Sequence, residues 1–320
     1  MAVSARQKSQ AQLDALNALD PATDRAAQNE IIGNALRDKS SRVVAKAATL
    51  AGERHLHERE KDLLAAYARF LVDPVKRDPN CFAKGAIARA LVELECQDVT
   101  FFLDGIRYLQ LEPVWGGSVD TAIDLRSSCA MGLVASGYSR AIPELAALLA
   151  DKEARARQGA ARAIACGNPR EAEALLRFKV LAGDAEPEVL GECFNGLLSI
   201  APDECVPFVG AQLAHANEAV RDFAALALGE SRHPAALAQL REAWDQAYVM
   251  ADMRAVLIRA AALHRSEAAF DWLVSIIETG SRAQAEIAAD ALSVYERNAK
   301  LLERVRAAMA KRDDGEKVHV

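Results

Sequence analysis

A short pattern of small and large apolar residues recurs along most of the chain. Its clearest copy is the stretch 220–229, which reads VRDFAALALG. Small residues stand three, four and six places after Arg221, and a large apolar residue stands seven places after it. Residues at this spacing share one face of a helix, and their small size lets a second helix approach closely. The pattern therefore predicts helices that pack through alanine-rich faces.

Similar copies of this pattern occur at intervals of roughly 30 to 42 residues, which is the range expected of stacked helical repeats. Each is followed by a second stretch in which larger apolar residues recur every three or four places, as in a helix with one buried face. The copies begin at Val44, Lys84, Arg126, Arg157, Leu190, Arg221, Val256 and Ala285. We expect an all-α chain of about eight antiparallel helix pairs.

A column of aspartates stands six places before the first residue of the pattern. It consists of Asp38, Asp78, Asp120, Asp151 and Asp184. Aspartate is a favoured N-cap, because its carboxylate accepts hydrogen bonds from the open amides of a helix's first turn. We therefore predict that these residues cap the alanine-rich helices. In the last three copies, His215, Met250 and Thr279 replace the aspartate.

The aspartate column, the arginine column (Arg126, Arg157 and Arg221) and the Ala-Ala-x-Ala-Leu core resemble HEAT repeats, including the short HEAT-like repeats of phycobilisome lyase proteins. The resemblance covers residues from about Asp38 to Lys311. It implies two antiparallel helices per unit, stacked into a right-handed α-solenoid, with the aspartate and arginine columns linking neighbouring units as a ladder. Val44, Leu190, Val256 and Ala285 stand in the place of the arginine, so the implied ladder is incomplete.

The expected organisation is one continuous domain. Residues 1–37 form an N-terminal helical cap with a helix over 5–19 and a second helix starting at Asp20-Pro21. The repeat solenoid covers 38–312, and 313–320 is a charged C-terminal tail.

Composition and charge exclude some classes of protein. A net charge of −6 and a pI near 5.6 do not suit a non-specific nucleic-acid binder, which needs a positive surface. The first residues have no apolar core typical of a secretory signal, and no run is long enough to span a membrane. The six cysteines lack any CxxC spacing and suit reduced, buried thiols. We expect a cytoplasmic monomer.

The most unusual local feature is the loop Trp115-Gly116-Gly117. It belongs to a long connection, 111–119, and a second long connection spans 72–80. Equivalent connections of a solenoid emerge along one edge, so we expect these two to be neighbours. Trp115, Gly116 and Gly117, with Lys76 and Arg77, are our candidate partner-binding residues, because tryptophan and arginine dominate interface hot spots. The alternative is that Trp115 plugs a groove between helices.

Signatures of catalysis, cofactors or metals are lacking. His57-Glu58 is one dipeptide of the kind that deoxyhypusine hydroxylases use several times to hold two irons, so we expect no metal site. No phosphate-binding loop, dinucleotide fingerprint or nucleophile elbow occurs. We expect no catalytic residues and no cofactor.

The function that follows is a non-catalytic scaffold that binds a protein or peptide on its concave face or loop edge. We expect the second helices to line the concave face. One alternative is a HEAT-like lyase or lyase subunit, and another is a DNA-binding or DNA-repair protein similar to the alkylpurine glycosylases built of HEAT-like repeats.

Overall fold

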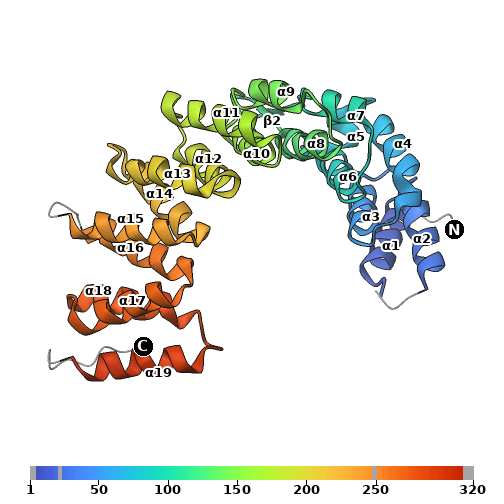
Figure 1. Ribbon diagram of the computed structural model, residues 1–320. Helices are drawn as coiled ribbons and strands as arrows, with labels where there is room; N and C mark the ends of the chain where they lie inside the picture. Colours follow the sequence, from blue (N-terminus) through green and yellow to red (C-terminus); the bar gives the residue numbers. More distant parts are fainter. Residues whose placement is uncertain (1–4, 21–23, 247–250, 313–320) are drawn as a thin grey trace. The chain divides into compact units, whose positions relative to one another are not determined.

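The structure is a computed structural model that describes residues 5–20, 24–246 and 251–312. The chain divides into two compact units, Met1–Asn168 and Pro169–Val320 (Figure 1). Both are built from helices, with one short hairpin in the first unit. The all-α fold class and the helix-pair organisation predicted from the sequence are confirmed. The predicted tail, 313–320, lies outside the described residues, and the domain boundaries stay a prediction.

The first unit begins with two helices that precede the repeats. Each repeat then has an alanine-rich helix, the first helix, which is followed by a second helix with larger apolar residues and by a connection. Its helices and strands are α1 (Ala5–Asn17), α2 (Arg25–Ala35), α3 (Ser41–Glu53), η1 (His57–Arg59), α4 (Glu60–Phe70), α5 (Pro74–Arg77), η2 (Pro79–Cys81), α6 (Phe82–Glu93), α7 (Val99–Gly105), β1 (Leu111–Val114), β2 (Gly117–Asp120), α8 (Ile123–Ala135), α9 (Ala141–Leu148) and α10 (Ala154–Ala165).

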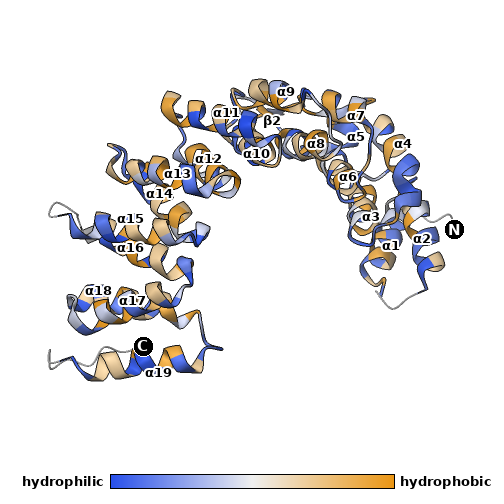
Figure 2. Cartoon of the chain, viewed as in Figure 1, coloured by the Kyte–Doolittle hydropathy of each residue, from blue (hydrophilic) through white to orange (hydrophobic). Residues whose placement is uncertain are grey.

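The second unit follows the same plan without strands in its described part. Its helices are α11 (Pro169–Ala182), α12 (Pro187–Ile200), α13 (Pro202–Gly210), η3 (Ala211–Ala214), α14 (Glu218–Ser231), α15 (Pro234–Asp245), α16 (Ala251–His264), α17 (Glu267–Thr279), α18 (Arg282–Ser293) and α19 (Ala299–Ala310). Figure 2 shows apolar and hydrophilic residues mixed along each helix, as expected of helices that bury one face.

Within each unit, the first helices of successive repeats pack directly on one another. In the first unit α3 contacts α6, α6 contacts α8, and α8 contacts α10. The small residues of the repeated pattern on these helices, including Ala47, Ala88 and Ala130, are fully buried. Close packing on this side curves the first unit toward its first helices, which lie on the inner side with α4, α7 and α9 outside (Figure 1). The expectation that second helices line a concave face was wrong for this unit, because alanine faces pack closer than faces of larger residues.

The core of the second unit ends in a cluster formed by α16 to α19. Phe270, Leu273 and Ile277 of α17 pack there against Leu292 of α18 and Leu301 of α19. At the margin of the cluster, the rings of Trp244 and Trp272 meet edge to face with centroids 5.8 Å apart. The large apolar residues of the second helices therefore fill the space between the layer of second helices and the layer of first helices.

The N-cap prediction for the aspartate column was wrong in position. The N-caps of α3 and α10 are Ser40 and Glu153, two residues after the aspartates. Asp38 instead accepts the amide N–H of Ser40 at 2.6 Å, and Asp151 that of Glu153 at 2.8 Å. Asp120 and Asp184 make the same bond to the second amide after them. These four aspartates thus stabilise the turn that leads into each helix. Asp78 differs, because its carboxylate accepts the amide N–H groups of Ala83 and Lys84 in the first turn of α6, which is the predicted capping contact.

The start of the second N-terminal helix also differs from the prediction. Asp24, not Asp20, is the N-cap of α2, and its carboxylate accepts the amide N–H groups of Ala26 and Ala27. Pro21 lies outside the described residues. Both positions offer an aspartate before a helical stretch, and local sequence does not separate them.

Five of the six cysteines are buried and Cys166 is exposed. Burial raises the pKa of Cys81 and Cys193 from 9.0 to about 12, and that of Cys96 to about 11. The folded state therefore favours the neutral thiols. The stability that this preference contributes is present below pH 9.0 and is lost as pH rises toward these values.

We expect a thiol reagent such as Ellman's reagent to modify only Cys166 quickly in the native protein at pH 8, because thiolates are the reactive form and the other thiols are covered. In denaturant all six cysteines should react. The absorbance of the released thiolate measures both numbers. Rapid reaction of two or more native thiols would contradict the buried placement.

Candidate protein-binding surface

The two long connections of the first unit lie side by side, as predicted from the sequence. The side-chain amide of Gln110 donates to the carbonyl oxygen of Asp78 at 2.8 Å. The amide N–H of Asn80 donates to the Glu112 carboxylate at 2.6 Å, which also accepts from Gln110 and Thr121. Glu112 thus joins the base of β1 to the segment before α6.

Two buried ion pairs hold this region to the first helices. Lys84 of α6 donates to Asp78 at 2.8 Å, and both side chains are fully buried. Arg126 of α8 donates to Asp120, the last residue of β2, at 2.5 Å, and its Nε lies 3.3 Å from the Asp151 carboxylate of the next repeat. The aspartate and arginine columns therefore form a link between repeats at Arg126.

The pKa of Asp120 reflects this arrangement. Burial by itself raises the pKa of a carboxyl group. Here the amide N–H of Ala122, the Arg126 guanidinium and the amide N–H of Gln110 outweigh burial and bring the pKa of Asp120 below its ordinary value. The charged form is therefore part of the folded state, and it fixes the end of β2 beside the start of β1.

The loop predicted around Trp115 is the turn of a β-hairpin. Strands β1 and β2 pair antiparallel with Val114 opposite Gly117, which leaves Trp115 and Gly116 as a two-residue turn. Gly116 has φ of +88°, a conformation that residues with a Cβ rarely adopt. The sequence predicts only a loop here, because each strand has four residues, too few to show alternation.

Trp115 stands at the tip of this hairpin with a relative exposure of 103%. It does not fill a groove between helices, which was the alternative to a binding role. A Cβ built on Gly116 or Gly117 would meet nothing within 4 Å. The tip is therefore open on all sides, while the base is fixed by Gln110, Glu112 and Asp120.

Exposed apolar side chains gather on the two connections. Among the described residues, thirteen large hydrophobic side chains are exposed, and nine of them fall between positions 71 and 119. We call these nine residues the hairpin surface: Leu71, Val72, Val75, Phe82, Leu109, Leu111, Val114, Trp115 and Val119. Exposed apolar groups concentrated in this way are typical of sites that bind another molecule.

Lys76 and Arg77 end the short helix α5 within the same region. Both are exposed, and neither has an ion-pair partner among the described residues. Two unpaired cations therefore lie beside apolar side chains. All five candidate residues belong to connections that the structure brings together.

Four polar residues that support the hairpin, Asn80, Gln110, Glu112 and Thr121, were not predicted from the sequence. The bonds of Asn80 and Gln110 to the other connection join residues 32 places apart, so no local pattern marks them. The only signal is the polar side chains at the two ends of the 111–119 connection, Gln110 and Glu112 at its start and Asp120 and Thr121 at its end.

The histidines near residue 57 have ordinary roles. His57 Nδ1 lies 3.2 Å from the Leu94 carbonyl oxygen, and its ring stacks on that of His55 at 6.4 Å. No group of three or more His, Cys, Asp or Glu side chains in the described part of the chain is placed to hold a metal ion. No described helix is long and apolar enough to cross a membrane.

Antiparallel helix pairs that stack through their first helices define an α-helical repeat protein. Within that class, residues 175–251, from α11 to the segment after α15, match the family model of HEAT repeats. The resemblance to HEAT repeats noted in the sequence is thus confirmed. No curated protein matches the chain.

Three solved structures are similar to this chain at low identity. The complex of CpcE and CpcF of phycocyanin lyase from Nostoc sp. PCC7120 is 14% identical with a TM-score of 0.37, covering 92% of this chain and 97% of that chain. Human deoxyhypusine hydroxylase in complex with glycerol is 16% identical with a TM-score of 0.31, covering 81% and 96%. An engineered protein is 17% identical with a TM-score of 0.38, covering 96% and 90%. Likenesses of this size carry no information on function.

Proposed function

We propose that this chain is a protein-binding scaffold whose hairpin surface inserts Trp115 into an apolar pocket of a partner protein. The observation that carries the proposal is a fully exposed tryptophan at the tip of a hairpin whose base is fixed by buried polar bonds. A rigid support lowers the entropy that binding must overcome, and a tryptophan supplies a large apolar contact.

The charges of this region indicate the partner's chemistry. Lys76 and Arg77, which have no ion-pair partner in the described part of the chain, lie beside the hairpin surface. A partner with acidic groups around its apolar pocket complements them, and such charges raise the association rate more than the affinity. The partner is therefore a protein with an apolar pocket and an acidic rim.

Contact through side chains fits this hairpin better than addition of a strand. Val114 and Gly117 close the turn, so the next pair, Pro113 and Ser118, turns its backbone groups outward. Pro113 has no amide N–H, so the outer edge of β1 lacks a donor at that point. A partner strand would find a short and incomplete edge, whereas the Trp115 side chain is open.

We expect Trp115→Ala to weaken capture of the partner at least about thirtyfold, which corresponds to about 2 kcal/mol for a central hot spot. The melting temperature should stay unchanged, because Trp115 covers no other side chain. Affinity capture from the native lysate, followed by titration of the captured protein, measures this effect.

Phe178→Ala is a matched control, since it removes another exposed aromatic side chain, which lies on α11 of the second unit. It should leave capture unchanged, and replacing Lys76 and Arg77 by Gln should mainly slow association and reduce its dependence on salt. Equal capture by the Trp115→Ala protein would disprove the proposal. Trp115-dependent binding to anionic lipid vesicles, without a protein partner, would also overturn it.

A further inference from the structure

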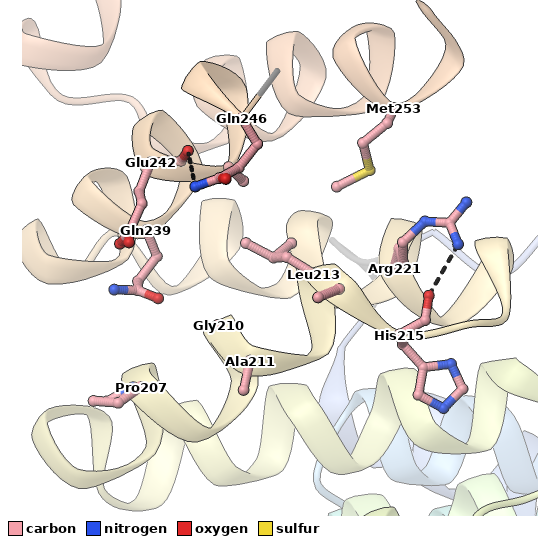
Figure 3. Close-up of a pocket in the computed structure, with 12 residues that line it drawn as sticks. Pro207, Gly210, Ala211, Leu213, His215, Arg221, Gln239, Glu242, Gln246 and Met253 are labelled. Carbon is pink, nitrogen blue, oxygen red and sulfur yellow. Dashed lines mark hydrogen bonds between the residues drawn. The ribbon is translucent and has the colours of Figure 1, made fainter. Parts of the chain in front are cut away.

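The second unit contains a pocket of about 570 Å³ that lies apart from the hairpin surface in sequence. It is formed between the end of α13 with η3, the second half of α15, and single residues of α14 and α16. Figure 3 shows Arg221 and His215 on one side with Met253 above Arg221, Gln239 and Glu242 on the other side, and Leu213 between the two groups. A volume of this size is typical of sites for small ligands or a few residues of a peptide.

Arg221 occupies the arginine column of the repeat, and the acid that accompanies this column elsewhere is missing here. In the first unit, Asp120 and Asp151 neutralise Arg126, and Asp78 neutralises the equivalent Lys84. At the corresponding place of the Arg221 repeat the chain has His215, and in the next repeat it has Met250. Neither residue supplies a negative charge to match Arg221.

His215 makes the turn hydrogen bond of the aspartate column, but it does not supply the negative charge of an aspartate. Its Nδ1 accepts the amide N–H of Asn217 at 3.0 Å, the same bond to the second amide that the aspartates make. The turn is therefore preserved while the carboxylate is absent. This replacement leaves the local fold intact and removes the charge that the arginine column pairs with in other repeats.

Arg221 has unused hydrogen-bonding capacity at the pocket. Its Nη1 donates to the carbonyl oxygens of His215 at 2.9 Å and Ala216 at 3.2 Å, and it has no ion pair among the described residues. Glu218 and Asp222 of the same helix form no ion pair with it, although the charge of Arg221 partly offsets the burial that raises the pKa of Asp222. A guanidinium has five N–H donors in a planar fork, so most of them remain available to a ligand.

The other lining residues indicate which group of the ligand accompanies its negative charge. Pro207, Leu213 and Met253 supply apolar surface, and the side-chain amides of Gln239 and Gln246 supply neutral hydrogen-bonding groups. Among the described lining residues Arg221 is the only Lys or Arg, and Glu242 on the opposite side disfavours a ligand of high negative charge. A singly charged carboxylate next to an apolar group suits these walls better than a phosphate.

We propose that this pocket binds a carboxylate joined to an apolar group, which takes the place of the missing aspartate beside Arg221. A peptide's C-terminal residue and a small organic acid share this chemistry. This site is inferred from the place of Arg221 in the arginine column and from the pocket, and it is independent of the hairpin surface.

The test uses the full-length protein and three probes: N-acetyl-leucine, acetyl-Ala-Ala-Leu with a free C-terminus, and the same tripeptide as its amide. The ¹³C-labelled ε-methyl group of Met253 is the reporter, with Met131 of the first unit as internal reference. We expect the free acids to shift the Met253 signal and the amide to bind at least tenfold more weakly. Stronger binding by the tripeptide indicates a peptide ligand, and equal binding by N-acetyl-leucine indicates a small acid.

Arg221→Gln should weaken both free acids at least tenfold, because a charge-assisted contact is lost. Arg306→Gln, which removes an exposed cation on α19, is the matched control and should change nothing. Several results would overturn the proposal: no shift of Met253 with either acid, equal binding of acid and amide, full binding by the Arg221→Gln protein, or displacement by inorganic phosphate at equal concentration. None of these outcomes depends on Trp115.

Discussion

Replacing Arg126 by Met is expected to lower the free energy of unfolding by about 3–5 kcal/mol. Arg126 is 1% exposed and its partner Asp120 is fully buried. The substitution leaves a buried carboxylate without its main cation, and it also removes the hydrogen bond to the Tyr108 carbonyl oxygen. Urea unfolding monitored by circular dichroism measures the loss, and amide hydrogen exchange over 111–120 shows whether the hairpin base loosens.

A second variant separates the uncompensated charge from the loss of packing. Combining Arg126→Met with Asp120→Asn removes the charge but keeps an oxygen that accepts the amides of Gln110 and Ala122. We expect the double variant to regain part of the lost stability. A double variant as unstable as the sum of the two single variants would show that the ion pair is not the dominant contribution.

The pH dependence of the same pair has a defined sign. Because the pKa of Asp120 is below its ordinary value of 3.8 in the folded state, its contribution is present above that value and is lost as pH falls through the folded pKa. The stability difference between the wild type and Arg126→Met should therefore shrink in strong acid.

Gly229→Ala is expected to destabilise the second unit by about 1–3 kcal/mol, although alanine favours helices. A Cβ at this position of α14 would lie 2.2 Å from the carbonyl oxygen of Ala260 in α16. The obstacle is backbone, so the two first helices must move apart. Urea unfolding and hydrogen exchange of α14 and α16 measure the change.

Gly85→Ala is the matched control for this substitution. It also lies in a first helix, α6, but a Cβ there would meet nothing within 4 Å. We expect it to stabilise the protein by about 0.5–1 kcal/mol, through the reduced freedom of the unfolded chain. Opposite signs of the two changes in unfolding free energy distinguish the effect of helix packing from that of helix propensity. A neutral Gly229→Ala would mean that α14 and α16 adjust without cost.

The sequence determined the repeat because its cause is local. Small residues at three, four and six places after a column residue place one alanine-rich face on each first helix, and that face is the one the structure buries. Counting six places back from the first residue of each copy also shows that His215 and Met250 replace aspartate. The proximity of connections 72–80 and 111–119 followed from their equivalent places in a repeat.

Turn geometry needed the structure, because several local solutions have similar energies. The aspartate column was interpreted as N-caps, whereas Asp38 and Asp151 bond to an amide two residues on and the helices begin later. Four-residue strands carry too few positions to show alternation, so the hairpin that presents Trp115 was not visible.

The candidate sites divide in the same way. From the sequence alone, Trp115, Lys76 and Arg77 were chemically distinctive residues on long connections, and Arg221 was an arginine without its usual aspartate. Tertiary structure decided that Trp115 is open to solvent and that Arg221 lines a pocket with Leu213 and Met253. The physical reason is range: helix faces follow from neighbours within two turns, whereas exposure and pockets depend on which distant segments pack together.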